Sequence, residues 1–147
     1  MFCFQRILLY LVPGFLIRML MKKEIIQLEY VFSKASKNAL WNYLSTASGL
    51  SGWFADEVTV QDETFIFVWD KHPADAELIA HIPLNSIRFR WKEEESPDLY
   101  FEFKLHANEL TGDTVLEVTD FAESEEKIET ISLWDTQIKR LTRILGI

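Results

Sequence analysis

Residues 124–147 read SEEKIETISLWDTQIKRLTRILGI. Apolar side chains recur in this stretch at steps of three and four residues, a spacing that places them on one face of an α-helix. Ser124 is a suitable N-cap, the acidic residues after it suit the positive end of a helix dipole, and Gly146 is placed to end the helix. The apolar stripe consists of Ile128, Ile131, Trp134, Ile138, Leu141 and Leu145. The stretch therefore predicts a long amphipathic C-terminal helix that needs an apolar partner surface.

The middle of the chain alternates between apolar and polar residues, which is the period of half-buried β-strands. Phenylalanine and tryptophan fall on one parity in the strands expected around residues 65–69, 87–91 and 99–105. Short turns between successive strands require antiparallel neighbours. A further strand is expected over 24–33, followed by two short helices within 36–52. We therefore predict an α+β fold in which an antiparallel sheet of about six to seven strands packs its aromatic side against the C-terminal helix.

Composition bounds the class of protein. The 147 residues suit one domain, and 48% hydrophobic residues with 26% charged residues indicate a globular chain. The formal net charge of −8 disfavours nucleic-acid binding, because no basic stripe is available to contact phosphates. The one cysteine, Cys3, excludes an internal disulfide and a thiolate metal cluster. This cysteine usage is consistent with a cytoplasmic location.

The first twenty residues differ from the rest. A helix over the apolar run Ile7–Ile17 would be about 16 Å long, well short of a hydrocarbon core of about 30 Å. Three interpretations stay open: translation that begins at Met21 or Met19, an interfacial membrane anchor, or an export signal. We expect residues 1–20 to be an extension of a domain that comprises residues 21–147. Membrane contact is expected only if the extension is retained.

Three stretches carry a resemblance to a known family: a helix pair that closes in leucine, a spacer and Trp-Phe, a proline-led strand entry, and a tryptophan near the start of the last helix. They are Ser36–Phe54 with Leu50 and Trp53, Ile82–Trp91 with Pro83 and Ile87, and Leu133–Leu141 with Trp134 and Ile138. The chain resembles the START-like (SRPBCC) helix-grip superfamily, and within it the branch similar to the activator of heat-shock-protein ATPase. The resemblance covers essentially all of residues 21–147. It implies a helix-grip fold, in which a curved antiparallel sheet wraps the C-terminal helix.

Groups that could carry catalysis are few. The three histidines lack metal-ligand spacing and are expected at the surface. They are His72, His81 and His106. Asp120 continues the inward parity of its strand, so it either caps the next turn or is a buried acid. Tyr43 and Thr46 are the other inward polar candidates. We therefore expect no metal and no cofactor, and catalytic activity stays an open question.

The resemblance and the inward aromatic residues together predict a non-enzymatic domain that binds a small hydrophobic ligand between sheet and helix. A packed core with a small cavity or none is the other interpretation of the same residues. Two alternatives stay open: an acidic, co-chaperone-like module for a basic protein partner, and an enzyme that resembles the cyclases or hydratases of the superfamily. The predicted pocket-lining residues are Trp53, Phe54, Phe67, Trp69, Phe89, Trp91, Phe101, Phe103, Trp134 and Ile138.

Overall fold

The structure is a computed structural model and describes residues 22–147. The predicted extension, residues 1–20, lies outside the described residues, so its three interpretations stay predictions. The elements, in chain order, are β1 (Lys23–Phe32), α3 (Lys37–Ser45), α4 (Ala47–Leu50), β2 (Glu57–Gln61), β3 (Thr64–Trp69), β4 (His72–Ile82), β5 (Ser86–Trp91), β6 (Phe101–Ala107), β7 (Thr114–Glu123), the 3₁₀ turn η1 (Ser124–Glu126) and α5 (Lys127–Leu145).

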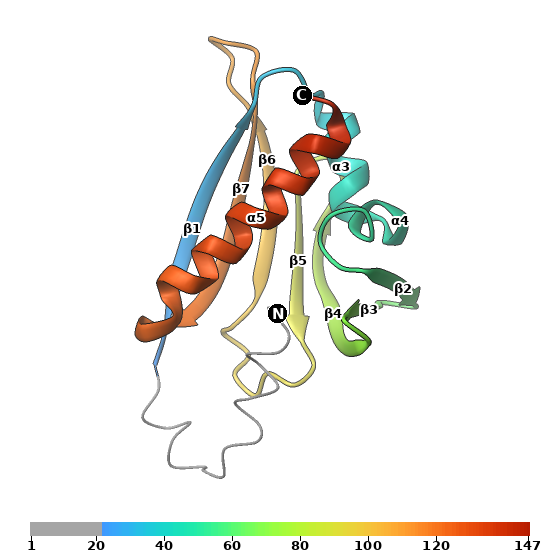
Figure 1. Cartoon of the computed structure of the whole chain (residues 1–147), viewed down its shortest axis with the longest axis vertical. Helices are drawn as coiled ribbons and strands as arrows, with labels where there is room; N and C mark the ends of the chain where they lie inside the picture. The colour runs from blue at the N-terminus through green and yellow to red at the C-terminus, as the bar shows by residue number, and fades with distance from the viewer. Residues whose placement is uncertain (1–21) are drawn as a thin grey trace.

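The seven strands form one antiparallel sheet in the order β1-β7-β6-β5-β4-β3-β2. Strand β1 pairs with β7 along its whole length, from Lys23 opposite Glu123 to Phe32 opposite Thr114, so the first strand lies beside the last. Figure 1 shows α5 lying across one face of the sheet, with α3 and α4 beside its C-terminal half. The predicted helix-grip architecture is confirmed.

The buried face of α5 carries Trp134, Ile138 and Leu141, as the sequence predicts. The prediction for Ile128 is wrong, because its side chain is 85% exposed. At 3.6 residues per turn Ile128 lies about 120° around the helix from Trp134, so it leaves the face that contacts the sheet. The buried face is completed by two polar residues, Thr130 and Gln137.

The two ends of α5 differ from each other in how they are capped. The helix begins at Lys127, after the 3₁₀ turn, and the N-cap residue Glu126 makes no side-chain cap hydrogen bond. The prediction that Ser124 caps this helix is therefore wrong. At the other end Gly146 adopts a φ of 75°, and its N–H donates to the carbonyl of Arg143 at 3.1 Å. The predicted stop is confirmed, since glycine reaches this left-handed conformation without steric cost.

Strand β4 departs from the simple alternation in its second half. The register against β5 shifts between Leu78 and Ala80, where the strand bulges. An extra residue on one strand moves the side chains that follow to the other face. Ala80 and Ile82, which follow Leu78 at strand spacing, are exposed, and so are Ile79 and His81 on the other parity.

The core centres on Phe54, which follows α4 and enters the space between the sheet and α5. Its ring centroid lies 5.0 Å from that of Phe67, 5.2 Å from that of Trp69 and 5.6 Å from that of Trp134. The Phe54 side chain is fully buried. Rings from both layers therefore meet around Phe54, and they pack largely in tilted and edge-on arrangements, which aromatic pairs favour. Within residues 22–147, no helix combines the length and the apolar character needed to cross a membrane.

Candidate functional site

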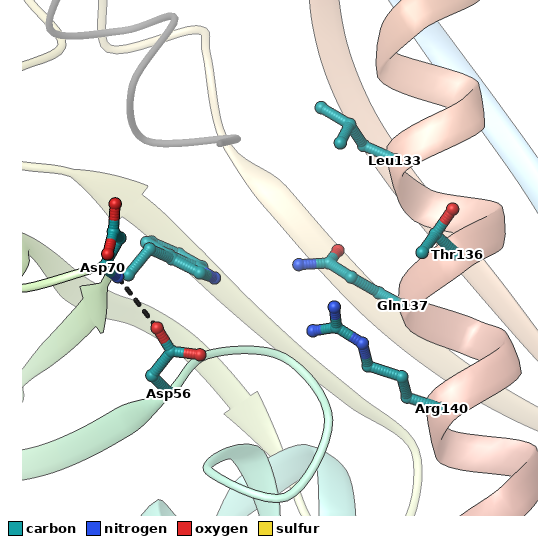
Figure 2. A pocket seen from close by; sticks show the side chains of 7 residues that line it. Asp56, Asp70, Leu133, Thr136, Gln137 and Arg140 are labelled. Atoms are coloured by element: carbon teal, nitrogen blue, oxygen red, sulfur yellow. Dashed lines mark hydrogen bonds between the residues drawn. The ribbon is translucent and has the colours of Figure 1, made fainter.

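A cleft of about 160 Å³ opens between α5 and the end of β3. One wall comes from α5, and the other comes from Trp69, the β3–β4 turn and the segment that precedes β2. Figure 2 shows Gln137 and Arg140 extending from α5 toward the side of the cleft that carries Asp56 and Asp70. The lining residues are Asp56, Trp69, Asp70, Leu133, Thr136, Gln137 and Arg140.

Both walls are tied to the backbone carbonyl of Phe54. The Trp69 indole Nε1–H donates to this oxygen at 2.7 Å, and the Gln137 amide Nε2–H donates to the same oxygen at 2.9 Å. A carbonyl oxygen has two lone pairs, so these two bonds use its full capacity. The Phe54 carbonyl therefore fixes the indole of β3 and the amide of α5 relative to each other.

The Gln137 side-chain oxygen is the unusual polar atom of the cleft. The residue is only 7% exposed, and its Oε1 has no hydrogen-bond partner within residues 22–147. A buried acceptor without a donor costs about 1–3 kcal/mol relative to a satisfied one. The α5 wall therefore contains a buried acceptor, Gln137 Oε1, whose desolvation is not offset by any described residue.

The opposite wall is shaped by a tight turn between β3 and β4. Asp70 and Lys71 adopt φ values of 46° and 67°, which non-glycine residues rarely take. The Asp56 carboxylate Oδ2 accepts a hydrogen bond from the Asp70 backbone N–H at 2.8 Å. The Asp56 backbone N–H donates in turn to the Val68 carbonyl at 2.9 Å. These bonds hold the turn in place and set two carboxylates, Asp56 and Asp70, on this side of the cleft.

The remaining groups of the α5 wall are Leu133, Thr136 and Arg140. Leu133 is half-buried and offers an apolar surface. The Thr136 hydroxyl donates to the Ser132 carbonyl at 3.0 Å, so its oxygen can only accept from a ligand. Arg140 is exposed, and none of the ion pairs within residues 22–147 includes it. The cleft thus combines an aromatic wall and an aliphatic contact with several acceptors and one cation.

The side chains that line the cleft suit the recognition of a small molecule. Asp56 and Asp70 are the two carboxylates of the cleft, and no cluster of three His, Cys, Asp or Glu side chains within residues 22–147 is arranged to hold a metal ion. No histidine, cysteine or serine lines the cleft, and the Thr136 hydroxyl already donates to the Ser132 carbonyl. The arrangement can hold a small molecule by an apolar surface and a few hydrogen bonds.

Two titratable side chains outside the cleft, Tyr30 and Glu123, have raised pKa values. Burial, followed by the hydrogen bond to Asp135 at 2.7 Å, raises the pKa of the Tyr30 hydroxyl well above its usual range. This bond links β1 to α5. Burial also raises the pKa of Glu123, and the nearby negative charge of Glu126 adds to the effect, whereas Lys23 opposes it. Both groups lie in the scaffold around the grip and line no part of the cleft.

Comparison with known proteins identifies the family. The family model of the START-like superfamily domain matches residues 20–147. The chain belongs to the START-like superfamily. The Bacteroides fragilis protein BfR322, solved by NMR, shares 43% identity with this START-like chain at a TM-score of 0.62, over 86% of this chain and 94% of its own. The curated proteins include no match.

More distant structures share the fold alone. The Aha1 dimer from Colwellia psychrerythraea is 18% identical, with a TM-score of 0.66 over 80% of this chain and 92% of that one. DynU16, a protein of the dynemicin biosynthetic locus, is also 18% identical, with a TM-score of 0.70 over 83% of this chain and 47% of that one. The assignment to the START-like superfamily, predicted from the resemblance, is confirmed. The distant structures show a shared fold and identify no ligand for this chain.

The structure brings the ten predicted lining residues together in the START-like core, where all are buried. Of the ten, Trp69 lines the cleft, whereas the other nine, including Phe54, belong to the same core cluster and line no part of the cleft. Their role in ligand binding stays a prediction. Phe54 contributes to the cleft in another way, through its backbone carbonyl.

Two of the inward polar candidates, Asp120 and Thr46, make side-chain hydrogen bonds within the scaffold. Asp120 lies inside β7 and is fully buried, and its Oδ2 accepts a hydrogen bond from the Trp134 indole Nε1–H at 3.0 Å. The interpretation of Asp120 as a turn cap is therefore wrong. Thr46 caps α4 by accepting from the Gly49 N–H at 2.9 Å, and the Tyr43 carbonyl accepts from Trp53. His72, His81 and His106 are exposed, as expected.

Six of the seven residues that line the cleft were not predicted from the sequence as site residues. Gln137 carried a usable signal in the sequence. It lies three residues after Trp134 and one before Ile138, so it falls on the apolar face of the helix although it is polar. Arg140 gave no such signal, because a cation toward the C-terminal end of a helix suits the helix dipole. The others are Asp56, Asp70, Leu133 and Thr136.

Proposed function

We propose that this START-like domain is a non-enzymatic binding module that holds a small molecule in the cleft between α5 and the end of β3. The observation that carries the proposal is the cleft itself, in which Trp69 and Leu133 provide apolar walls beside the buried Gln137 oxygen. Binding sites of this kind combine a mainly apolar surface with a few polar groups that orient the ligand.

The volume limits the size of the ligand. An apolar cavity of about 150 Å³ engineered into another protein binds benzene, and pockets for drug-sized ligands measure about 300–1,000 Å³. A cleft of about 160 Å³ therefore suits a single ring with a small substituent, or one end of a larger molecule that continues into solvent. The hydrophobic ligand expected from the sequence becomes, in this proposal, a small amphipathic one.

The aromatic core supports this location. Phe54 fills the centre of the grip, and the rings around it are buried and in mutual contact. A ligand that entered there would have to displace packed rings, which interiors at crystal-like density resist. The cleft already has free volume beside Trp69. The alternatives of a basic protein partner and of a cyclase-like activity stay predictions.

Titration of the ¹⁵N-labelled protein with indole or phenol tests the proposal. The Trp69 indole N–H and the Gln137 side-chain amide are expected to shift in a saturable way, at millimolar affinity typical of so few ligand atoms. The Trp53 indole N–H, which donates to the Tyr43 carbonyl at 2.9 Å, is the internal reference and is expected to stay in place.

A pair of variants makes the test specific. Thr136→Phe would place a ring in the cleft and is expected to abolish the shifts, because Thr136 lines the cleft and is exposed. Lys139→Phe adds a ring to the same helix at an exposed residue that lines no part of the cleft, and it is expected to leave binding unchanged. Binding that survives Thr136→Phe, or shifts centred on Trp53, would refute the proposal.

A further inference from the structure

We propose that β1 is a homodimer interface, at which two copies of the chain pair their β1 strands antiparallel about a two-fold axis at Leu28. Strand β1 stands first in the sheet order, so one of its two edges pairs with no strand of residues 22–147 (Figure 1). Pairing the two free edges joins the sheets of both copies into one continuous sheet. The interface is separate from the cleft, none of whose lining residues belongs to β1.

The free edge of β1 lacks several features that protect strand edges from pairing. Natural proteins protect an exposed edge by making the strand short, by placing proline or a bulge in it, or by covering it. Strand β1 is ten residues long, contains no proline, and pairs with β7 through its whole length without a register shift. The opposite edge differs, because β2 has only five residues and α4 lies against it. The β1 edge is therefore the better suited of the two for pairing.

The side chains of β1 follow a pattern that is symmetric about Leu28. On both sides of Leu28 a polar residue comes first, and the next two positions carry bulky apolar or aromatic residues. The mirror pairs are Gln27 with Glu29, Ile26 with Tyr30, and Ile25 with Val31. An antiparallel pairing centred on Leu28 sets each residue opposite its mirror position in the second copy. The strand is therefore complementary to itself, as a two-fold interface requires.

The same pairing covers the exposed apolar side chains of β1. Ile25 is 48% exposed and Val31 is 63% exposed, and both lie on the parity opposite to the buried Ile26, which is the outer face of the sheet. In the centred register Ile25 of each copy faces Val31 of the other, and such β-branched pairs stabilise neighbouring strands. Behind Ile25 the apolar surface continues to Phe121, its neighbour on β7, whose ring lies 5.1 Å from that of Tyr100.

The registers on either side of the centred one are less favourable. A shift of one residue sets outer side chains opposite inner ones, which strand pairing does not allow. A shift of two residues that moves the axis to Glu29 sets the two Glu29 carboxylates opposite each other, and like charges in this position destabilise the pair. The opposite shift moves the axis to Gln27 and sets Ile25 against Glu29 and Val31 against Lys23. The centred register sets the uncharged Gln27 opposite Glu29 and avoids each of these contacts.

Sedimentation velocity of the full chain over a range of concentrations tests whether the dimer forms. The interface consists of one strand from each copy, so it is small, and we expect a dissociation constant of about 10–100 μM. The average mass should rise from that of one chain to that of two as the protein concentration passes through this range. A chain that stays monomeric up to about 1 mM would overturn the inference.

Two double variants test the register. Ile25→Lys with Val31→Lys sets ammonium groups opposite each other across the centred interface, and it is expected to weaken the dimer about 100-fold. Ile25→Lys with Val31→Glu sets opposite charges there, and it is expected to bind at least about tenfold more tightly than the first variant. Both side chains are exposed and lie about 20 Å apart within one strand, so the changes leave the core intact and their charges meet only across the interface.

Val60→Lys is the matched control, because Val60 is an exposed valine on β2, the strand at the other edge of the sheet. It is expected to leave the dissociation constant unchanged. A dimer that Val60→Lys disrupts and the two lysines on β1 leave intact would place the contact at β2 and overturn the inference. Equal weakening by both double variants would overturn the register centred on Leu28. A dimer that the two lysines disrupt and the lysine–glutamate pair restores supports the proposed interface.

Discussion

Replacing isoleucine by alanine at two positions of α5 gives the sharpest test of how the helix faces the sheet. Ile138 is 5% exposed and packs in the core, whereas Ile128 is 85% exposed on the first turn of the same helix. Truncation of a buried isoleucine to alanine costs about 2–5 kcal/mol. Alanine regains about 0.4 kcal/mol of helix propensity. We therefore expect Ile138→Ala to lower the free energy of unfolding by about 2–4 kcal/mol.

Ile128→Ala is the matched control, because the chemical change and the helix are the same. Its free energy of unfolding is expected to change by less than about 0.5 kcal/mol, with a small gain from helix propensity. Urea unfolding followed by tryptophan fluorescence measures both. At an m-value of about 1.5 kcal/mol/M, a loss of about 3 kcal/mol lowers the midpoint by about 2 M. Equal losses for the two variants, or a larger loss for Ile128→Ala, would refute the packing described for α5.

Three further predictions concern the scaffold. Leu84 has a φ of 62° and is exposed, so Leu84→Gly is expected to gain about 0.5 kcal/mol of stability in thermal unfolding, and a loss would contradict the strain. Gly49→Ala would place its Cβ 2.2 Å from the Asn42 carbonyl oxygen, so urea unfolding should show a loss of about 3 kcal/mol, and a neutral result would contradict this close approach. The raised pKa of Glu123 means that the native state binds its proton more tightly than the unfolded chain, so stability is lost as the pH rises through that pKa. Glu123→Gln should therefore stabilise the protein more at pH 7 than below the ordinary glutamate pKa, and urea titrations that give the same gain at both would contradict the shift.

The sequence could predict the fold because its strongest signals are local. The spacing of Trp134, Ile138 and Leu141 needs no knowledge of the partner surface, and the alternation of aromatic residues identifies the inward side of each strand. The same periodicity could not place Ile128, because a stripe read in steps of three and four drifts around the helix as it lengthens. It also gave no warning of the bulge in β4, which depends on pairing with β5.

The cleft depends on contacts between distant parts of the chain, which explains why its residues could not be assigned from spacing. Gln137 and Phe54 are 83 positions apart, and their hydrogen bond exists only once α5 has packed over the loop after α4. Asp56 reaches Asp70 only through the antiparallel pairing of β2 and β3. The sequence correctly supplied the aromatic residues of the grip, but whether their rings leave free space is decided by Phe54, which enters from a loop.

The proposed function requires that the ligand lies in the cleft beside Trp69 and that the aromatic core stays closed. Isotope-filtered NOEs between bound indole and the ¹³C-labelled protein locate the ligand. The ligand protons are expected to show NOEs to the Leu133 methyl groups and to the Trp69 ring, which line the cleft. NOEs to the methyl groups of Ile87 or Leu116, which are buried in the core, would contradict it.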